Sequence, residues 1–338
     1  MNKYPKVNYI GNKVKVAEWI IEKLPIKQGL VLDLFCGGCS MSYALKQSGF
    51  CVYSNDILYS SFALAKALIE NQSDMLELNG IDLESFFDNK ELLRLEWMVN
   101  YLYFDYEVRE LVSLINYAKT LTEYKNYIFL SLLRRSMIRK IPYSRMTIKW
   151  EEIVKFRDEE LSYQKYKRRR AYHNQPFLAH IKKELNDYNS AIFNNGLENK
   201  AFQKDCVELL DFLQSQNKKI DLVYIDPPYP STMNNYVGFY GGFDKMLSME
   251  CKNFLDFTHK DSFLHSLEKV AAKSKSISRY IAISLNNRCN PSADTIRPTL
   301  NKYCKNIDMF ETTHIYKVTG KKNKNIHNEI LMVCELGG

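Results

Sequence analysis

The sequence predicts an α/β fold built on an open, mostly parallel sheet. The first observation is a repeated unit of strand, turn and helix near the start of the chain. An apolar run at 30–35 leads into Gly37-Gly38, and a helical segment follows at 41–47. A second run at 50–53 ends in a polar turn, followed by an Ala- and Leu-rich helical segment at 58–69. Two successive units of this kind are typical of a doubly wound sheet.

The second observation is the return of strand-like runs beyond residue 200. These runs lie at 201–205, 220–225, 279–284 and 328–333. Between them and the first units, residues from about 80 to 195 are rich in Glu, Lys, Arg, Tyr and Leu, with mostly helical periodicity. We therefore expect a sheet domain made of residues 1–75 and 197–338, interrupted by a mainly helical insertion at 76–196.

Composition places few limits on the partner. The 338 residues include 47 Lys and Arg against 39 Asp and Glu, a formal net charge of +8, which is compatible with a polyanionic partner without selecting one. No stretch approaches the roughly 18 to 20 apolar residues of a membrane span. The polar start of the chain lacks the apolar core of an export signal. We therefore expect a cytosolic protein whose eight cysteines are reduced thiols.

Cys36 and Cys39 form a C-x-x-C pair, which is a pattern found in redox and zinc sites. The chain has no second C-x-x-C and no H-x-x-x-H to complete a zinc site, and this pair lies inside a Gly-rich turn. We interpret the spacing as coincidental and expect no metal.

The most specific motif is Asp226-Pro227-Pro228-Tyr229, directly after the apolar run at 220–225. A strand that ends in a carboxylate places that carboxylate at the carboxyl edge of the sheet, where open α/β sheets bind their ligands. Each proline fixes its own φ and biases the preceding residue toward extended conformations, so the loop is stiff. The Asp side chain and backbone carbonyls can then accept hydrogen bonds from one amino group, while Tyr229 offers a face for stacking a base. The alternative is a turn that merely ends a strand.

Such a set of acceptors suits methylation of an aromatic amine. The lone pair of an exocyclic amino group is delocalised into the ring, which makes the nitrogen a poor nucleophile. Acceptors that hold its two hydrogens favour a tetrahedral nitrogen whose lone pair points at an electrophilic methyl group. No strong base is required if the proton leaves after transfer begins, and the site then acts mainly by orienting the reactants and by electrostatics.

Three further acidic positions follow expected strands. Asp33 precedes Phe35 and the glycine turn, which permits close approach of a ligand, although the turn is not a G-x-G-x-x-G dinucleotide fingerprint. Asp56 lies 23 residues later, a position suited to hydrogen bonding with ribose hydroxyls. Asp205 follows the run at 201–204 and suits the amino group of an adenine. For Asp56 and Asp205, capping of the following helix is an equally good interpretation.

These motifs occur together in a fixed order: Tyr9-Ile10-Gly11-Asn12-Lys13, Asp33-Leu34-Phe35-Cys36-Gly37-Gly38, Ser54-Asn55-Asp56, Asp205 and Asp226-Pro227-Pro228-Tyr229. In this order the chain resembles the α-group adenine-N6 DNA methyltransferases, which include Dam-type enzymes and FokI-type modification methylases. The stretches at 8–13 and 54–61 look closest to the FokI-type branch. The resemblance extends from residue 8 to about 335, although the middle segment matches only in position and general character.

The resemblance implies a Rossmann-like sheet that uses S-adenosylmethionine, and it implies roles for matching residues. The residues implied to hold the cofactor are Tyr9, Lys13, Asp33, Phe35, Gly37, Asp56 and Asp205, with Asp56 at the ribose and Asp205 at the adenine. The residues implied to hold the target base are Asp226, Pro227, Pro228 and Tyr229. Cys36 and Cys39 depart from the small residues usual around this turn, but cysteine is itself small.

The same resemblance places target recognition in the basic insertion and implies double-stranded DNA as the substrate. Flipping a base out of a duplex costs a few kcal/mol, which phosphate contacts must offset. The insertion residues expected to supply these contacts are Arg134, Arg135, Arg139, Lys140 and Arg145. Met137 and Ile138 are interleaved with them, so we expect one helix face to pack while the arginines point outward. The basic runs at 165–170 and 317–324 and the aromatic stretch at 234–242 are further candidates.

Several alternatives stay open. The Asp-Pro-Pro-Tyr motif does not by itself choose between DNA and RNA adenine, although the order of the motifs and the helical insertion favour DNA. A methyltransferase fold retained as a silent DNA-binding module has the same outline. Cytosine-N4 enzymes more often carry Ser at the position of Asp226. A carbon-5 cytosine enzyme needs a Pro-Cys nucleophile, and no cysteine here follows a proline. The family context also implies a bacterial or phage protein that acts near the nucleoid as a monomer on DNA, alongside a possible cognate restriction endonuclease.

Overall fold

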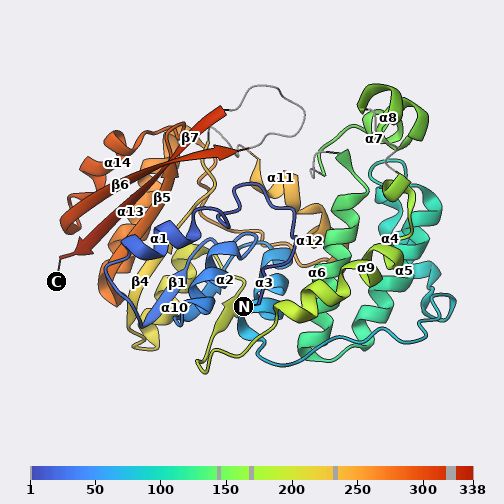
Figure 1. The fold of residues 1–338 in the computed structure, drawn as a ribbon, viewed down its shortest axis with the longest axis horizontal. Coiled ribbons are helices and arrows are strands. Elements are labelled where there is room, and N and C mark those ends of the chain that lie inside the picture. Colours follow the sequence, from blue (N-terminus) through green and yellow to red (C-terminus); the bar gives the residue numbers. More distant parts are fainter. Residues whose placement is uncertain (1, 143–145, 167–170, 231–234, 317–324, 338) are drawn as a thin grey trace. The chain divides into compact units, whose positions relative to one another are not determined.

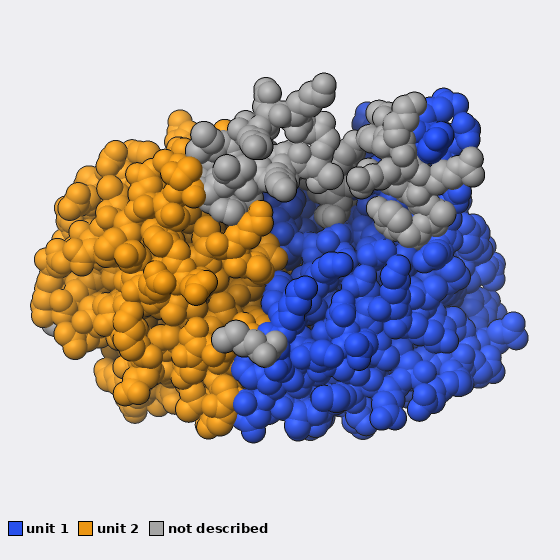
Figure 2. All heavy atoms as spheres, in the orientation of Figure 1, with its two compact units in different colours: residues 1–10, 66–194, 237–250 blue, residues 11–65, 195–236, 251–338 orange. Residues whose placement is uncertain are grey.

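The computed structural model describes residues 2–142, 146–166, 171–230, 235–316 and 325–337. The chain divides into two compact units, which Figure 2 shows in different colours. The helical unit comprises residues 1–10, 66–194 and 237–250. The sheet unit comprises residues 11–65, 195–236 and 251–338.

The sheet unit contains a seven-stranded mixed sheet in the order β3-β2-β1-β4-β5-β7-β6. Figure 1 labels β1, β4, β5, β6 and β7 of this sheet. Its strands are β1 (Leu30–Asp33), β2 (Cys51–Asn55), β3 (Lys200–Phe202), β4 (Ile220–Ile225), β5 (Ser278–Asn286), β6 (Cys304–Tyr316) and β7 (Asn325–Leu336). The pairs within β1–β5 are parallel, whereas β7 runs antiparallel to both β5 and β6. The α/β fold class predicted from the sequence is confirmed.

The central strands are buried along almost their whole length. All four residues of β1 are buried, as expected for a parallel strand that is covered on both faces. Gly29 sets the start of this strand: its φ is +119°, and a Cβ there would lie 2.4 Å from Asp221 Oδ2. That same oxygen accepts a hydrogen bond from the Leu30 N–H at 2.7 Å. Glycine at this position therefore allows Asp221 of β4 to fix the register of β1.

Within its described residues the sheet unit has six helices: α1 (Ala17–Lys23), α2 (Ser40–Gln47), α3 (Tyr59–Ala65), α10 (Cys206–Ser215), α13 (Lys260–Ile277) and α14 (Ala293–Leu300). Helices α10, α13 and α14 share one apolar core with the sheet. That core takes alternate strand residues, for example Leu30 and Leu32 of β1 and Val223 and Ile225 of β4. Because side chains alternate between the faces of a strand, the intervening residues point to the other face.

This alternation places polar side chains on the face opposite that core. On β1 the residue out of phase with Leu32 is Asp33, which contacts Ser42 of α2. On β5 and β7, Ser284 and Glu329 likewise alternate with residues of the apolar core, so they point to the opposite face, and both are buried. The alternation of side chains along each strand therefore places polar groups from separate strands on the same face of the sheet.

The helical unit is built from α4 (Asn89–Leu95), α5 (Asp105–Thr120), α6 (Glu123–Arg139), α7 (Trp150–Arg157), α8 (Glu159–Tyr166), α9 (Phe177–Ala191), α11 (Tyr236–Tyr240) and α12 (Gly242–Leu247), the first residue of α11 belonging to the sheet unit. A π-helical turn at Lys66–Glu70 and short 3-10 turns at Glu84–Phe86, Glu96–Met98 and Ala171–Asn174 complete it. Helices α5, α6 and α9 contribute buried apolar residues to its core, among them Leu111, Leu132 and Ile181. No helix in the described ranges is both long enough and apolar enough to cross a bilayer.

The division into units differs from the ranges expected from the sequence. The sequence predicts the insertion, 76–196, as one continuous segment. The helical unit instead includes residues 66–75 and draws in two distant segments, 1–10 and 237–250. One of these segments is tied in by Tyr240, whose hydroxyl accepts a hydrogen bond from the Ile10 N–H at 3.0 Å. Such long-range pairing leaves no local pattern in the sequence.

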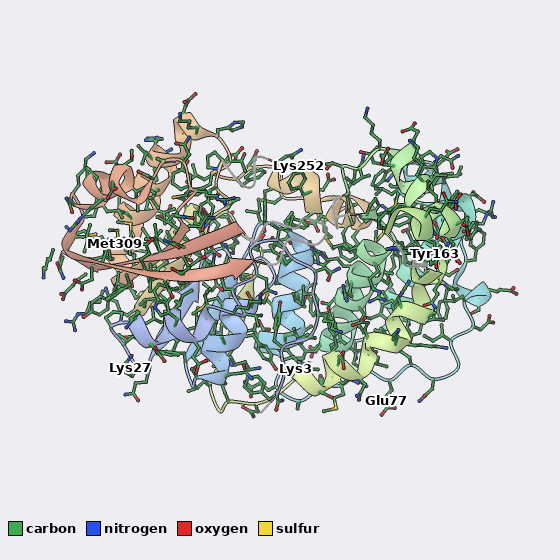
Figure 3. The ribbon with its side chains drawn as sticks, turned by 45° about the horizontal axis from the view of Figure 1, so that its top comes forward. Lys3, Lys27, Glu77, Tyr163, Lys252 and Met309 are labelled. Carbon is green, nitrogen blue, oxygen red and sulfur yellow. The ribbon has the colours of Figure 1, made fainter. Side chains whose placement is uncertain are left out.

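One strand was not predicted. β6 forms the edge of the sheet, and most of its residues up to Thr313 are exposed or half-exposed. Met309, labelled in Figure 3, is 46% exposed. An edge strand that buries so little lacks the apolar pattern by which the other strands were recognised.

A buried charge cluster holds the helical unit together. Glu107 of α5 accepts hydrogen bonds from Arg157, with Nη1 to Oε2 at 2.7 Å, and forms an ion pair with Lys140 Nζ at 2.8 Å. All three side chains are at most 2% exposed. Burial alone would raise the pKa of Glu107, but the hydrogen bonds and charges of Arg157 and Lys140 lower it. The carboxylate is therefore ionised, and removal of its charge takes away the carboxylate that pairs directly with two buried cations.

We predict that Glu107→Gln destabilises the helical unit by about 3–5 kcal/mol, the usual cost of leaving a buried charge without its partner. Chemical denaturation at pH 7 measures the loss. Because the pKa of Glu107 is lower in the folded state, its contribution is present above the unfolded pKa of about 4.3 and disappears as the pH falls further. The control is Asp105→Asn in the same helix, whose exposed pair with Arg109 contributes less than about 1 kcal/mol. Equal losses for the two variants would contradict this account.

Candidate functional site

The candidate site lies where the strand order of the sheet reverses. β1 and β4 are neighbours, and from them the chain proceeds outward in opposite directions, to β2 and to β5. Ligands of open α/β sheets bind at the carboxyl ends of strands at such a point. Asp33 ends β1, Asp56 follows β2 and Asp226 follows β4. The structure thus brings these three predicted residues to one edge of the sheet unit.

Asp226 is held through one of its two carboxylate oxygens. Lys13 Nζ lies 3.2 Å from Oδ1, and the Tyr229 hydroxyl lies 2.7 Å from the same atom. The Tyr229 oxygen is also 2.7 Å from the Ser284 carbonyl oxygen, which fixes the ring from a neighbouring strand. Within the described residues Oδ2 has no such contact, and the side chain stays 19% exposed. One oxygen is therefore immobilised while the other is left to accept a hydrogen bond from a ligand.

Lys13 is a buried cation shared between two carboxylates. Its Nζ lies 2.7 Å from Glu329 Oε1, closer than to Asp226, and its side chain is 7% exposed. Its backbone N–H donates to Ser40 Oγ at 2.9 Å, at the first turn of α2. Burial alone would lower the pKa of Lys13, but Asp226, Tyr229 and Glu329 together raise it well above its ordinary value. Lys13 is therefore charged at any physiological pH.

Glu329 and Ser284 were not singled out from the sequence. Glu329 is almost fully buried on β7 and accepts a hydrogen bond from Ser284 Oγ at 2.8 Å. The available signal was a carboxylate at the start of the apolar run 330–333, where a charge needs a buried partner. That partner, Lys13, lies more than 300 residues earlier, so nothing local could identify it.

The environment of Asp226 makes it a strong acceptor. Burial raises the pKa of its carboxyl group, Lys13 opposes that effect, and Glu329 adds to it. Pro227 is buried and Pro228 half-buried in the stiff loop that follows. A basic carboxylate beside fixed backbone carbonyls suits the capture of an amino group. Tyr229, expected to stack on a base, is only 6% exposed in this structure and packs in the apolar core.

Asp33 is buried with one oxygen satisfied. Ser42 Oγ donates to Oδ2 at 2.6 Å, whereas Oδ1 is buried and has no hydrogen-bond partner among the described residues. Burial raises the pKa of this carboxyl group to about 7; the hydrogen bond from Ser42 opposes the shift, and the negative charges of Asp226 and Asp56 add to it. An unsatisfied, buried acceptor with a raised pKa favours a ligand that brings a positive charge or a donor.

Asp56 closes the glycine turn that follows β1. Its Oδ2 accepts from the Gly37 N–H and its Oδ1 from the Leu58 N–H, both at 2.9 Å. Gly37 has a φ of +48°, which favours glycine there. The Tyr236 hydroxyl also lies within 3.0 Å of both carboxylate oxygens. Capping and ligand binding, the two interpretations from the sequence, are both compatible with this geometry.

Asp205 is a helix cap in this structure. Its Oδ1 accepts from the Val207 and Glu208 N–H groups at the start of α10, and its Oδ2 accepts from the Leu255 N–H at 2.6 Å. The capping interpretation is therefore confirmed, and a contact with a cofactor stays a prediction. Nearby, the Phe35 ring packs edge-on against Phe257, with centroids 5.1 Å apart.

Tyr9 belongs to the helical unit, whereas the other expected cofactor residues belong to the sheet unit. Its ring is stacked on Tyr240, with centroids 4.5 Å apart. The Arg134 guanidinium lies 5.6 Å from the Tyr9 ring centroid and 5.5 Å from that of Tyr240. Arg134 thus forms cation–π contacts with an aromatic pair inside this unit.

The expected outward orientation of the basic cluster on α6 is wrong. Arg134, Arg135 and Lys140 are at most 4% exposed. Arg135 and Arg139 both reach Glu184 of α9, at 3.5 and 2.9 Å, and Lys140 pairs with Glu107. Ion pairs with acidic residues that are distant in sequence therefore keep these basic side chains buried. A phosphate contact would require them to leave buried partners, which argues against that role for Arg135 and Lys140.

The remaining positions singled out from the sequence are the C-x-x-C pair, the aromatic stretch and three basic positions or runs. Cys36 and Cys39 are free thiols whose sulfur atoms lie 3.7 Å apart, and the described part of the chain contains no cluster of residues that could hold a metal ion. The aromatic stretch at 234–242 contains α11 and the start of α12. Arg145 and the runs 167–170 and 317–324 lie outside the described residues.

Comparison with known proteins gives one consistent family. A family model described as D12 class N6 adenine-specific DNA methyltransferase matches residues 9–290. The chain is 44% identical over 338 residues to Type II methyltransferase M2.HphI of Haemophilus parahaemolyticus, covering 98% of both chains. It is 28% identical over 254 residues to modification methylase StsI of Streptococcus sanguinis, covering 67% of this chain and 34% of that protein.

A third relative is Type II methyltransferase M.FokI of Planomicrobium okeanokoites, 25% identical over 360 residues. The match covers 96% of this chain and 50% of that protein, so the chain spans only part of the StsI and FokI proteins. The family model, the near full-length relative and the Rossmann-like sheet with its Asp-Pro-Pro-Tyr edge agree. The chain belongs to the D12 class of N6 adenine-specific DNA methyltransferases.

Proposed function

We propose that this enzyme transfers a methyl group from S-adenosylmethionine to the N6 amino group of a flipped adenine in double-stranded DNA, with Asp226 as the acceptor that orients the amine. The observation that carries the proposal is the asymmetry of Asp226. Lys13 and Tyr229 hold its Oδ1, while its Oδ2 remains available at the edge of the sheet. The family supplies the reaction, and this geometry supports the assignment of the residue.

The residues around the end of β1 fit the cofactor. S-adenosylmethionine supplies an electrophilic methyl group on a sulfonium, and its methionine part carries an ammonium group. The buried Oδ1 of Asp33 lacks a partner among the described residues, and a cationic donor would satisfy it. We assign Asp33, Phe35 and Gly37 to the methionine side, Asp56 to the ribose and Asp205 to the adenine. The Tyr236 hydroxyl contacts the carboxylate assigned to the ribose and would have to move aside.

The chemical role of the site is orientation. The carboxylate of Asp226 and the carbonyl groups of the Pro227-Pro228 loop would accept the two amine hydrogens and localise the nitrogen lone pair. Asp226, whose pKa is raised by burial, accepts the amine proton once transfer has begun. Tyr229 would then fix the carboxylate through its hydroxyl rather than by stacking in this conformation, because its ring is buried.

We assign target recognition to the helical unit, which would read the duplex and hold the phosphates that flank the flipped base. Arg139 is the described member of the basic cluster that keeps partial exposure. Two of the relatives are named as Type II methyltransferases and one as a modification methylase. By this similarity we propose a restriction-modification setting, with a possible cognate endonuclease. We also propose action as a monomer on DNA near the nucleoid.

The assignment of Asp33 predicts opposite effects on stability and on cofactor binding. Asp33→Asn should raise the free energy of unfolding of the cofactor-free protein at pH 8 by up to about 4 kcal/mol, because it removes a buried charge whose pKa is raised to about 7. A raised folded-state pKa means that the wild type loses stability as the pH rises from about 4 to 7, so the gain should shrink toward pH 4. The same variant should bind S-adenosylmethionine at least about tenfold more weakly, a loss of about 1.4 kcal/mol. Thermal unfolding and calorimetric titration measure the two effects.

The control for this variant is Asp211→Asn on α10, whose pair with Lys273 is exposed. It should change neither quantity, because exposed pairs contribute little. An Asp33→Asn protein that is less stable at pH 8, or that binds the cofactor as well as the wild type, would overturn the assignment.

The assignment of Asp226 predicts that Asp226→Ala lowers methyl transfer by at least about a hundredfold while the affinity for DNA stays unchanged. The measurement uses labelled S-adenosylmethionine and unmodified bacterial DNA, followed by digestion to nucleosides. Label should appear in the deoxy form of N6-methyladenosine with the wild type and be nearly absent with the variant. Asp211→Asn again serves as the control. Full activity of Asp226→Ala would remove the residue from the site, and label in RNA alone would change the substrate.

A further inference from the structure

We infer that Glu329 is a positioning residue for methyl transfer: by taking the nearer share of the Lys13 ammonium, it keeps Asp226 a free and strongly accepting carboxylate. The inference rests on the proposed role of Asp226 and assigns a function to a residue on the last strand of the sheet. Its basis is the arrangement of one buried cation between two carboxylates.

The distances show how Lys13 is shared. Nζ lies 2.7 Å from Glu329 Oε1 and 3.2 Å from Asp226 Oδ1. A strong ion pair in a buried setting is short, so the Glu329 contact is the tighter of the two. Ser284 Oγ donates to the same Oε1 at 2.8 Å and fixes the carboxylate in place. Lys13 is therefore held mainly by Glu329, and only part of the electrostatic attraction of its ammonium group acts on Asp226.

The charge balance of the cluster follows from this sharing. One ammonium faces two carboxylates, so the group of three carries a net negative charge in a site from which water is largely excluded. Without Glu329, the whole charge of Lys13 would act on Asp226. A carboxylate in a full ion pair is a weaker acceptor for a neutral amine, because its electron density is already committed to the ammonium.

The groups that face Asp226 come from several elements. Lys13 approaches from the N-terminal segment, Glu329 from β7, Tyr224 and Tyr229 from β4 and its loop, and Asp33 from β1. Among these, Lys13 lowers the pKa of Asp226 and Glu329 raises it. The two effects oppose each other, so a change at Glu329 is transmitted to Asp226 in a known direction.

The site also explains why a glutamate is needed at this position. Glu329 is 1% exposed, and burial of a carboxylate is costly unless it is paired and hydrogen-bonded. An apolar side chain at this position would leave Lys13 buried with Asp226 as its remaining ion-pair partner among the described residues, so Glu329 also stabilises the fold. The second carboxylate beside Lys13 therefore has two effects, on the stability of the fold and on Asp226, and the pH dependence of the reaction separates them.

The test is Glu329→Gln, which keeps the size of the side chain and an oxygen that can accept from Lys13 and Ser284 but removes the charge. Single-turnover methyl transfer is measured across pH with saturating S-adenosylmethionine and DNA. The plateau rate should fall about tenfold or more, while the affinities for S-adenosylmethionine and DNA, measured separately by titration, stay unchanged. Because Asp226 becomes less basic, the acid limb of the profile should move down by about one pH unit.

The shift of the acid limb separates this role from a structural one. Loss of packing would lower the rate of the variant by the same factor at every pH. Loss of the charge would instead make the difference between the wild-type and variant rates smaller at pH values below the acid limb of the wild type. Parallel profiles for the wild type and Glu329→Gln would therefore overturn the inference. The control is Glu335→Gln on the same strand, whose pair with Arg279 is exposed, and which should leave the profile unchanged.

A second variant keeps the test decisive if Glu329→Gln does not fold. Glu329→Asp retains the charge at a shorter reach, so it should keep the wild-type acid limb while lowering the plateau rate. A downward shift of the limb in Glu329→Asp would contradict a role based on charge. Failure of the proposed function itself has a different result, because the wild type would then transfer no methyl group to DNA.

Discussion

A single buried ammonium group connects the parts of the sheet unit that form the site. Lys13 lies in the N-terminal segment, Asp226 follows β4, and Glu329 lies on β7. Desolvation of a lysine is costly, and two carboxylates with good geometry offset that cost here. The carboxylates need the lysine in turn, because burial of a carboxylate without the ammonium group would also be costly. Distant segments of the chain are therefore fixed relative to one another by the same charges that prepare Asp226.

The alternation of side chains along the strands makes this cluster possible. One face of the sheet is given to an apolar core shared with α10, α13 and α14. The opposite phase carries Asp33, Ser284 and Glu329 on three strands, and all three are buried. A shift of one residue in any of these strands would move its polar side chain into the apolar core. The hydrophobic packing of one face thus sets the positions of the polar groups on the other.

The sequence was sufficient where the signal is local. The Asp-Pro-Pro-Tyr motif directly follows an apolar run, and the structure places its strand at 220–225 as predicted. The exposed edge strand β6 was missed because it lacks such a run. The cluster on α6 was assigned the wrong orientation because the partners of its cations, Glu107 and Glu184, lie on other helices. Glu329 was overlooked for the same reason, since its meaning depends on a lysine at the other end of the chain. Burial of charge is a property of pairs, and pairs distant in sequence cannot be recognised from one sequence alone.

The antiparallel direction of β7 has a consequence for the order of synthesis. Because β7 runs against its neighbour, its early residues lie at the carboxyl edge, and Glu329 is paired in register with Asn286 at the end of β5. The cluster around Asp226 therefore draws on β7, which follows β5 and β6 in the chain, as well as on the N-terminal segment that carries Lys13. A nascent chain that already carries the glycine turn, the helical unit and the Asp-Pro-Pro-Tyr loop still holds Lys13 without its nearer partner. On this arrangement the site is completed only once β7 has paired with β5, so a chain synthesised only as far as the Asp-Pro-Pro-Tyr loop is not a competent modifier of DNA.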